Sequence, residues 1–441
     1  MQVMSRWCSA LRPQCTSTTE EEQRERGTLL SSDGANASGD SALTVSGPSA
    51  GESAVFEGAN HRRSFMRHCI ASWAVWPTVA TLLLMVVAPA GAGSGAQHRA
   101  THEAMLAVVR GGVPGVTTAA ADAQGSWSAA AGVGDLRTGK PRSARDRYRV
   151  GSITKTFIAT VLLQLEAEGE LSLDDRVDKW APGLVEGGGN SGRRISLRQL
   201  LNHTSGIFNY SDDGYFARAV LGTGGFFRNR YKTVPLHRLI DLAMQHEPDF
   251  PSGTSWNYSN TNYLLAGKVI EEITGRSYGE EIRRRIIDPL RLRATSLPGS
   301  RVTVPQPSSR SYSRLGHTAT GQLHDVTELN PSIAGPAGEM ISNSADLSRF
   351  YSALLRGQLL PRKQLAEMTS TVPAWNREGY GLGLTKRVLS CGITVWGHDG
   401  RIHGSVSIAA VTSDGRHALA VNFNGDWAAG AARVIEAEFC G

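Results

Sequence analysis

A serine and a lysine stand three positions apart at the start of a long apolar run, in the sequence Gly151-Ser152-Ile153-Thr154-Lys155. If this run is helical, the two side chains share one face, and the Lys155 amine can reach the Ser152 hydroxyl. A serine hydroxyl is a weak nucleophile that an adjacent base activates. The spacing therefore predicts a Ser152 nucleophile with Lys155 as its base; the alternative is a helix-capping serine followed by a solvated lysine.

The apolar run from 157 to 165 has to position this pair. It is apolar over more than half of the circumference of a helix, which is typical of a helix buried in a large core. A lysine at the head of such a helix is removed from water, and burial lowers the pKa of a lysine. We therefore expect Lys155 to carry a neutral amine near neutral pH, as a base must.

Two later segments offer polar side chains that could complete the site. Tyr258 and Asn260 end a turn-rich loop before a helix, and His398 lies between Gly397 and Gly400 at the end of a strand. Polar groups at the end of a rigid element can converge on a cleft, and glycines let the backbone approach a substrate closely. The alternatives are a helix-capping Asn260 beside a core tyrosine, and a histidine that only occupies a turn.

Strand patterns lie at both ends of the folded region, and helical patterns lie between them. The strands are expected at 116–121, 127–133, 380–384, 393–396, 405–412 and 417–423, with a turn at 397–404. The predicted fold class is α+β, with an antiparallel sheet flanked by helices. One domain at 97–441 is expected to contain a mainly helical insertion at about 170–345.

The N-terminal stretch has a different composition from this domain. Residues 1–61 are rich in Ser, Gly, Thr and Glu, which predicts a disordered leader or a gene-model extension. Residues 62–93 combine Arg62-Arg63, an apolar run and small residues, which predicts an export signal with a twin-arginine pattern. The alternative is an uncleaved membrane anchor. We therefore expect a secreted protein that meets the membrane only through this signal.

Cysteine usage agrees with export. Of five cysteines, only Cys391 and Cys440 lie in the predicted mature domain. Because an oxidising compartment favours disulfides, we expect these two cysteines to be joined.

Charge and motif patterns argue against several classes of partner. The formal charge of +6 is scattered along the chain, without the basic stripe of a nucleic-acid-binding protein, so we expect no nucleic-acid partner. No histidine pair has the spacing of metal ligands, and no glycine-rich phosphate loop is present. We therefore expect neither a metal nor a cofactor.

The three polar segments together resemble the signature of the serine penicillin-recognising superfamily, which includes the penicillin-binding proteins and the class C β-lactamases. Its pattern is Ser-x-x-Lys, then Tyr-x-Asn or Ser-x-Asn, then Lys-Thr-Gly or His-x-Gly, and Ser152, Tyr258 and His398 begin the three matches. In these motifs the chain is most similar to the secreted actinomycete D-alanyl-D-alanine carboxypeptidases. The resemblance implies a β-lactamase/transpeptidase-like fold. It also implies a monomeric, cell-wall-associated serine hydrolase that cleaves peptidoglycan stem peptides and is acylated by β-lactams.

The resemblance further implies a role for each motif residue. Ser152 attacks the carbonyl, Lys155 and Tyr258 accept its proton, and Tyr258 returns one to the leaving amine. Backbone N–H groups of Ser152 and Arg401 form the oxyanion hole. His398 replaces the usual lysine as a polar or cationic partner. The substrate-binding residues that the resemblance implies are Asn260, His398, Asp399, Gly400, Arg401 and Phe216.

Two departures from the family pattern concern the carboxylate of the substrate. The arginine that grips it in the carboxypeptidases is replaced by Thr385, and Arg387 lies on the same face of that strand. Asp399 and Arg401 replace hydroxyl residues, and we expect Arg401 to bind the carboxylate, which Asp399 would repel unless it pairs with Arg401. The alternatives are therefore a β-lactamase or an esterase of the same fold, or a penicillin-binding or wall-binding module without turnover.

Overall fold

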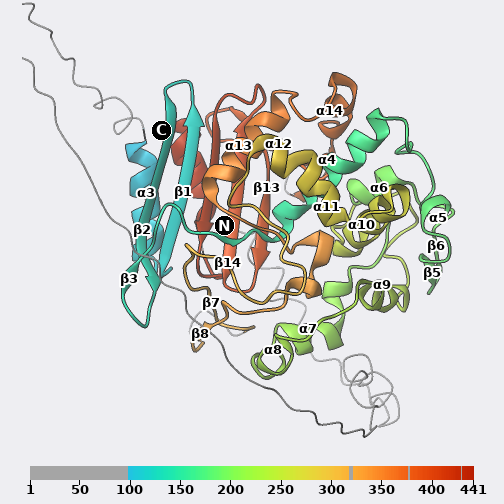
Figure 1. The fold of residues 1–441 in the computed structure, drawn as a ribbon, viewed down its shortest axis with the longest axis horizontal. Helices are drawn as coiled ribbons and strands as arrows, with labels where there is room; N and C mark the ends of the chain where they lie inside the picture. The colour runs from blue at the N-terminus through green and yellow to red at the C-terminus, as the bar shows by residue number, and fades with distance from the viewer. Residues whose placement is uncertain (1–97, 317–320, 376–377, 429) are drawn as a thin grey trace, which may run out of the picture. The chain divides into compact units, whose positions relative to one another are not determined.

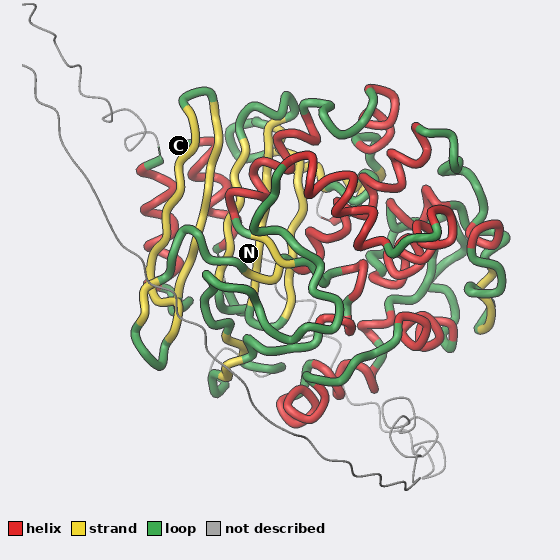
Figure 2. The backbone as a smooth tube through the Cα atoms, in the orientation of Figure 1, coloured by secondary structure: helices red, strands yellow, loops and turns green. Residues whose placement is uncertain are grey.

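The computed structural model describes residues 98–316, 321–375, 378–428 and 430–441 (Figures 1 and 2). The predicted leader at 1–61 and the predicted export signal at 62–93 lie outside the described residues. Within the ranges that are described, no helix has both the length and the apolar character needed to cross a membrane.

A nine-stranded antiparallel sheet forms the centre of the described fold, and its long strands are the yellow segments of Figure 2. The strand order is β10-β11-β12-β13-β14-β15-β1-β2-β3. The strands are β1 (Gly115–Asp122), β2 (Gly125–Asp135), β3 (Lys140–Pro141), β10 (Val372–Pro373), β11 (Gly379–Tyr380), β12 (Thr385–Val388), β13 (Thr394–Ile402), β14 (Ser405–Thr412) and β15 (Ala418–Phe423). Because β1 pairs with β15, the sheet joins the two ends of the domain, and the predicted α+β class is confirmed.

Helices cover both faces of this sheet. α3 (Arg99–Arg110) and α15 (Ala431–Cys440) pack together, and Met105 and Phe439 share one core cluster with β1, β14 and β15. α13 (Ser344–Leu355) packs on the same three strands outside that cluster (Figure 1). Every residue of β15 is buried, as expected for a strand that is covered on both faces.

The middle of the chain is mainly helical, as predicted. Its helices are α4 (Thr154–Ala167), α5 (Val177–Trp180), α6 (Leu197–Leu201), α7 (Gly214–Val220), α8 (Thr223–Asn229), α9 (Leu236–Met244), α10 (Asn260–Thr274), α11 (Tyr278–Ile282) and α12 (Asp288–Leu290), and α14 (Arg362–Met368) follows α13. Three short strand pairs are β4 (Tyr148–Arg149) with β9 (Ile341–Ser342), β5 (Glu186–Gly187) with β6 (Asn190–Ser191), and β7 (Tyr312–Ser313) with β8 (His324–Asp325). The β4–β9 pair joins the segment before α4 to the segment before α13.

The main departure from the predicted strands is β13, which contains His398 within the strand. The turn predicted at 397–404 is therefore wrong over most of its length. Gly397 and Gly400 serve close packing instead of turning the chain. A Cβ on Gly397 would lie 1.9 Å from a carbonyl oxygen of β14, and a Cβ on Gly400 would lie 1.8 Å from the carbonyl oxygen of Val150. These contacts are between segments distant in sequence, so the glycine pattern alone could not separate packing from turning.

The predicted strand at 380–384 is also shorter than expected. β11 ends at Tyr380, and Gly383 has a φ of 69°, a left-handed conformation that side chains rarely adopt. The chain therefore turns at Gly383 before β12 begins.

The predicted Cys391–Cys440 disulfide is present, with the two Cα atoms 5.7 Å apart. It ties the turn between β12 and β13 to the end of α15. The bond thus holds the C-terminal helix against the sheet next to the strand that carries His398.

Candidate active site

Ser152 lies in a single 3₁₀ turn, Gly151–Ile153, that leads directly into α4. No side chain caps α4, so the structure does not support the alternative of a helix-capping serine. The turn is pressed against β13, because a Cβ on Gly151 would lie 2.7 Å from the backbone nitrogen of Arg401. The backbones of Ser152 and Arg401 therefore run beside each other, as a shared oxyanion hole would require.

The Lys155 side chain is fully buried and has three oxygen partners. Its Nζ lies 3.1 Å from Ser152 Oγ, 2.7 Å from Asn260 Oδ1 and 2.7 Å from the carbonyl oxygen of Ala337. None of these partners is a carboxylate, so burial lowers the pKa of Lys155 well below its ordinary value. A neutral amine has two N–H donors and one lone pair. The amide and carbonyl oxygens accept the two donors, which leaves the lone pair for the Ser152 hydroxyl proton.

Tyr258 stands beside this pair. Lys155 Nζ lies 4.9 Å from the centre of its ring, and its buried hydroxyl has no hydrogen-bond partner among the described residues. Burial raises the pKa of Tyr258, and the nearby Ser152 hydroxyl opposes that shift only in part. The phenol is therefore protonated at neutral pH, and it is free to donate a hydrogen bond to a bound substrate.

Asn260 is the first residue of α10, and its side chain does not cap that helix. Its Oδ1 accepts the bond from Lys155, and its Nδ2 donates to Ser211 Oγ at 3.1 Å. The structure thus gives Asn260 a task that the sequence did not suggest: it holds the Lys155 amine.

His398 is buried behind these groups, and both of its ring nitrogens have protein partners. Nε2 lies 2.9 Å from Tyr380 Oη, and Nδ1 lies 2.5 Å from the carbonyl oxygen of Asp399. Burial, with a smaller contribution from Lys155, lowers the pKa of His398 to about 4. The imidazole is therefore neutral at neutral pH, which favours the polar role over the cationic role that the sequence allowed for His398.

The charged residues near the end of β13 pair differently from the prediction. Arg387 Nε lies 2.8 Å from Glu378 Oε1, and Arg387 Nη2 lies 3.4 Å from Asp399 Oδ2. Asp399 therefore pairs with Arg387 rather than with Arg401. The Arg401 side chain is exposed, and no ion pair of it is found in the described part of the chain. The Thr385 hydroxyl donates to the carbonyl oxygen of Gly397 at 2.8 Å.

Comparison with known protein families identifies the family to which the chain belongs. The family model described as Beta-lactamase matches residues 94–436, which is most of the chain. The chain belongs to the beta-lactamase family. Its antiparallel sheet with flanking helices is the β-lactamase-like fold, and the protein is a serine hydrolase of the beta-lactamase and penicillin-binding protein group.

Three proteins of known sequence or structure are similar to this chain. Penicillin-binding protein 4 of Amycolatopsis lactamdurans is 29% identical over 67% of this chain and 77% of its own length. A D-stereospecific amidohydrolase from Streptomyces sp. is 56% identical, with a TM-score of 0.75 over 78% of this chain and 99% of that chain. The D-amino acid amidase of Ochrobactrum anthropi SV3 is 28% identical, with a TM-score of 0.67 over 78% of this chain and 98% of that chain. The chain spans about half the length of several other curated relatives.

Phe216, which the family resemblance implied as a substrate contact, is held by residues of its own segment. It is in α7, where its ring packs edge-on against Tyr210 with ring centres 5.1 Å apart. Its backbone N–H donates to the capping residue Asp213 at 2.8 Å. No contact with Ser152 or Tyr258 is found among the described residues, so Phe216 stays a predicted substrate contact without structural support.

Two tryptophans that the sequence did not single out lie near Tyr258. Trp375 has its ring centre 5.5 Å from that of Tyr258, and Trp256 packs edge-on against Trp375 at 4.5 Å. Trp375 is 43% exposed. An apolar surface beside the catalytic phenol is suited to an apolar substrate side chain. Tryptophans in a loop give no periodic signal, so only the fold could bring them to this place.

His203 and Tyr380 were also missed as members of the site. Tyr380 Oη bridges the two histidines, at 3.2 Å from His203 Nε2 and 2.9 Å from His398 Nε2. The segments 201–206 and 379–384, in which these two residues lie, also resemble the family, so the resemblance was the available signal. It gave them no role.

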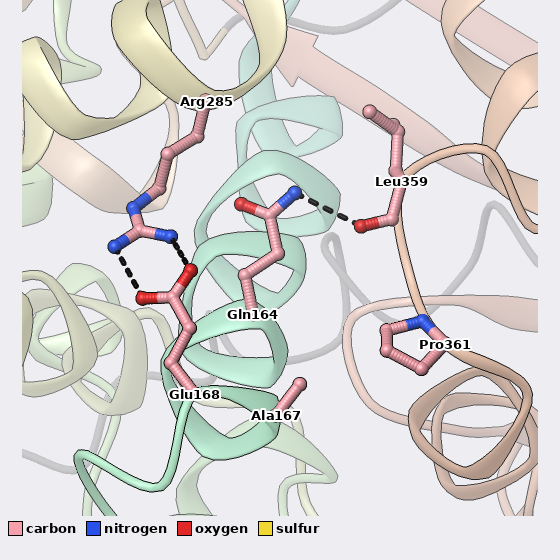
Figure 3. A pocket seen from close by; sticks show the side chains of 6 residues that line it. All are labelled: Gln164, Ala167, Glu168, Arg285, Leu359 and Pro361. Carbon is pink, nitrogen blue, oxygen red and sulfur yellow. Dashed lines mark hydrogen bonds and ion pairs between the residues drawn. The ribbon is translucent and has the colours of Figure 1, made fainter.

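A shallow hollow of about 410 Å³ lies at the opposite end of α4. Its lining residues are Gln164, Ala167, Glu168, Arg285, Leu359 and Pro361 (Figure 3). None of the predicted site residues lines it. In the described ranges, no cluster of His, Cys, Asp and Glu could hold a metal ion either.

Proposed function

We propose that this protein hydrolyses D-amino-acid amides through an acyl-enzyme on Ser152. The observation that carries the proposal is the 3.1 Å contact between Lys155 Nζ and Ser152 Oγ, made by an amine that is fully buried without a carboxylate. The similarity to a D-stereospecific amidohydrolase and a D-amino acid amidase supports the choice of substrate class.

The geometry suggests how each group acts. Ser152 Oγ attacks the amide carbonyl while its proton passes to the neutral Lys155 amine, and the backbone N–H groups of Ser152 and Arg401 stabilise the oxyanion. The protonated phenol of Tyr258 donates a proton to the leaving nitrogen, and the Lys155 ammonium restores it. Water then attacks the ester carbonyl of the acyl-enzyme. The acid leaves, and Ser152 regains its proton.

The charges at the end of β13 favour an amide over a substrate with a free carboxylate. Arg387 is paired with Glu378 and Asp399, so this guanidinium is already engaged by two carboxylates. Thr385 carries no charge, and Asp399 is exposed. Two carboxylates and one guanidinium leave one net negative charge in this cluster, which would repel a terminal carboxylate but not a neutral carboxamide.

D-alanyl-D-alanine carboxypeptidase activity is the second candidate, and the exposed Arg401 favours it. A guanidinium can hold a carboxylate through two parallel hydrogen bonds. If Arg401 does so, Arg401→Ala should lower kcat/KM for a D-Ala-D-Ala peptide by about 10- to 100-fold, the value of one charge-assisted pair. It should leave the hydrolysis of a D-amino-acid amide unchanged, since the amide has no carboxylate.

One substrate panel separates these functions. The purified protein is offered D- and L-phenylalanine amide, a D-Ala-D-Ala peptide, a penicillin and a short-chain ester, with mass spectrometry of the Ser152 peptide. Our proposal requires the D-amide to be turned over faster than the L-amide and the peptide. Preferred cleavage of the penicillin or the ester would support a β-lactamase or an esterase. A stable adduct without turnover would indicate a binding module. Ser152→Ala should form no adduct with any of them.

We also propose that the protein is exported, on the basis of the arginine pair, apolar run and small residues at 62–93. The mature protein recovered outside the cell should begin between residues 91 and 97. An N-terminus upstream of the apolar run on extracted membranes would support an anchor instead.

A further inference from the structure

A chain of hydrogen bonds runs through the interior beneath Tyr258. It begins at the backbone of Ser259 and passes through His203, Tyr380 and His398 to the carbonyl oxygen of Asp399. The three side chains of this chain are 0%, 0% and 4% exposed, respectively. They come from the loop after α6, from β11 and from β13, so only the folded protein assembles them.

The backbone groups at the two ends fix the direction of every bond. The carbonyl oxygen of Asp399 can only accept, so His398 Nδ1 carries a hydrogen. A neutral His398 then has a lone pair on Nε2, and the Tyr380 hydroxyl donates to it. The Tyr380 oxygen in turn accepts from His203 Nε2–H, and His203 Nδ1 accepts from the Ser259 N–H at 3.2 Å. The arrangement satisfies every group only while both histidines are neutral.

His398 faces one basic side chain of the site. The titratable groups around it are Lys155 from α4, His203 after α6, Tyr258 from the loop before α10, Tyr380 from β11, and Asp399 on its own strand. Lys155 has to accept a proton when Ser152 attacks. A positive charge on His398 would oppose that proton transfer, because two like charges would then share one buried site.

We propose that His203 and Tyr380 are positioning residues that hold His398 in its neutral Nδ1–H form, so that the proton released by Ser152 can be accepted by Lys155. This inference rests on the proposed acyl-enzyme function of Ser152. The pKa shifts agree with it, because burial holds the pKa of both His203 and His398 below the ordinary value for histidine.

The decisive variant is Tyr380→Phe, which removes only the oxygen that joins the two histidines. Without the hydroxyl donor, the lone pair of His398 Nε2 is free to take a proton. The pKa of His398 should rise by roughly half to one pH unit, the effect of losing one buried hydrogen bond to the neutral form. The acid limb of the kcat/KM profile should move to higher pH by the same amount.

Tyr351→Phe is the matched control. Tyr351 is also fully buried, and its hydroxyl lies 2.9 Å from Thr156 Oγ1. Thr156 follows Lys155 in the sequence, but neither Tyr351 nor Thr156 belongs to the chain of hydrogen bonds between the two histidines. Tyr351→Phe should lose one buried hydrogen bond without moving the acid limb. If both variants move the limb equally, the effect is general loosening of the core, and the proposal is wrong.

Nuclear magnetic resonance of ¹⁵N-labelled histidine rings gives a readout that needs no turnover. His398 should titrate at a higher pH in Tyr380→Phe than in the parent protein, and His203→Gln should produce a smaller rise in the same direction. An unchanged His398 titration in a folded Tyr380→Phe protein would overturn the proposal. If the His398 titration shifts in Tyr380→Phe but the parent protein never forms an acyl-enzyme on Ser152, the role of the hydrogen-bond chain is upheld and the proposed function is refuted.

Discussion

Each end of α4 lies beside a buried or nearly buried basic side chain, and the two surroundings have opposite effects on its charge. At the first turn, Lys155 is surrounded by neutral oxygens, and its pKa falls well below the ordinary value. Beyond the last turn, the Arg285 guanidinium is 10% exposed and pairs with the carboxylate of Glu168 (Figure 3) and with that of Glu281. The hydrogen bonds that Arg285 donates to Glu168 are the largest cause that raises the pKa of Arg285.

The difference shows that a neighbouring carboxylate, more than burial, decides whether a buried basic side chain keeps its proton. Removing a charge from water is costly, and an amine without a carboxylate avoids the cost by losing its proton. It then becomes a base. A guanidinium with two carboxylates keeps its charge and forms ion pairs that link neighbouring helical segments. In Figure 3 one of these ion pairs joins Arg285 to Glu168 at the end of α4.

Removing the amine should give the largest effect. Lys155→Met keeps the apolar stem but has no base, so kcat/KM should fall by about 10²- to 10⁴-fold, the usual contribution of general base catalysis. Lys268→Met is the control, because Lys268 lies on the surface of α10 and pairs with Glu272 at 2.8 Å. Steady-state kinetics on a D-amino-acid amide decide the matter. A Lys155→Met enzyme with parental activity would show that the base is another group.

The disulfide beside the catalytic end should come next. Replacing Cys391 and Cys440 by serine releases a link across 49 residues. The chain-entropy model predicts a loss of about 4 kcal/mol in the free energy of unfolding. Urea denaturation of the parent and the double variant measures this loss. Because the bond does not touch Ser152 or Lys155, kcat/KM should change little in conditions where the variant is folded; a large loss there would mean that the disulfide also sets the position of β13.

The two ends should also differ in how they link pH to stability. The folded pKa of Lys155 lies below its ordinary value of 10.5, so between these two pH values the unfolded chain binds a proton that the folded chain does not. Stability from this group is therefore lost as pH falls and gained as pH rises toward 10.5. One full proton gives a slope of about 1.4 kcal/mol per pH unit. Lys155→Met should have a flatter stability profile between pH 7 and 10, and an equal slope in both proteins would contradict the neutral amine.

The smallest effect is expected at the far end. Glu168 is 48% exposed, so solvent screens its pair with Arg285, and Glu168→Gln should cost only about 0.5–1 kcal/mol. Glu281 still holds the guanidinium in this variant. Catalysis should not change. A loss of activity in Glu168→Gln would mean that the two ends of α4 are coupled, which denaturation and kinetics measured together would reveal.

Local geometry explains which parts of the site the sequence could predict. Ser152 and Lys155 lie within one helical turn of each other, so their spacing was sufficient to predict their contact. Cys391 and Cys440 were the only candidates for pairing in the mature domain. The sheet followed from alternating strands at both ends of the chain, which needed no knowledge of individual contacts.

The contacts that were missed or mistaken connect distant segments. Asn260 reaches Lys155 across 105 residues, and no pattern in either segment reports that bond. Asp399 pairs with Arg387 because β12 and β13 are adjacent in the sheet, a fact that the strand order supplies and the motif does not. His398 was assigned to a turn because glycines that pack closely look the same in sequence as glycines that turn.

Those closely packed glycines limit how substrate preference can diverge in this protein. Any side chain at Gly400 would collide with the carbonyl oxygen of Val150 and push β13 away from the Ser152 turn. Position 400 is therefore closed to change, whereas Asp399 and Arg401 on either side of it are exposed. A mutant library aimed at new acyl donors should keep position 400 fixed and vary its two neighbours. Substitutions at these exposed positions can change substrate contacts without moving β13 away from the Ser152 turn.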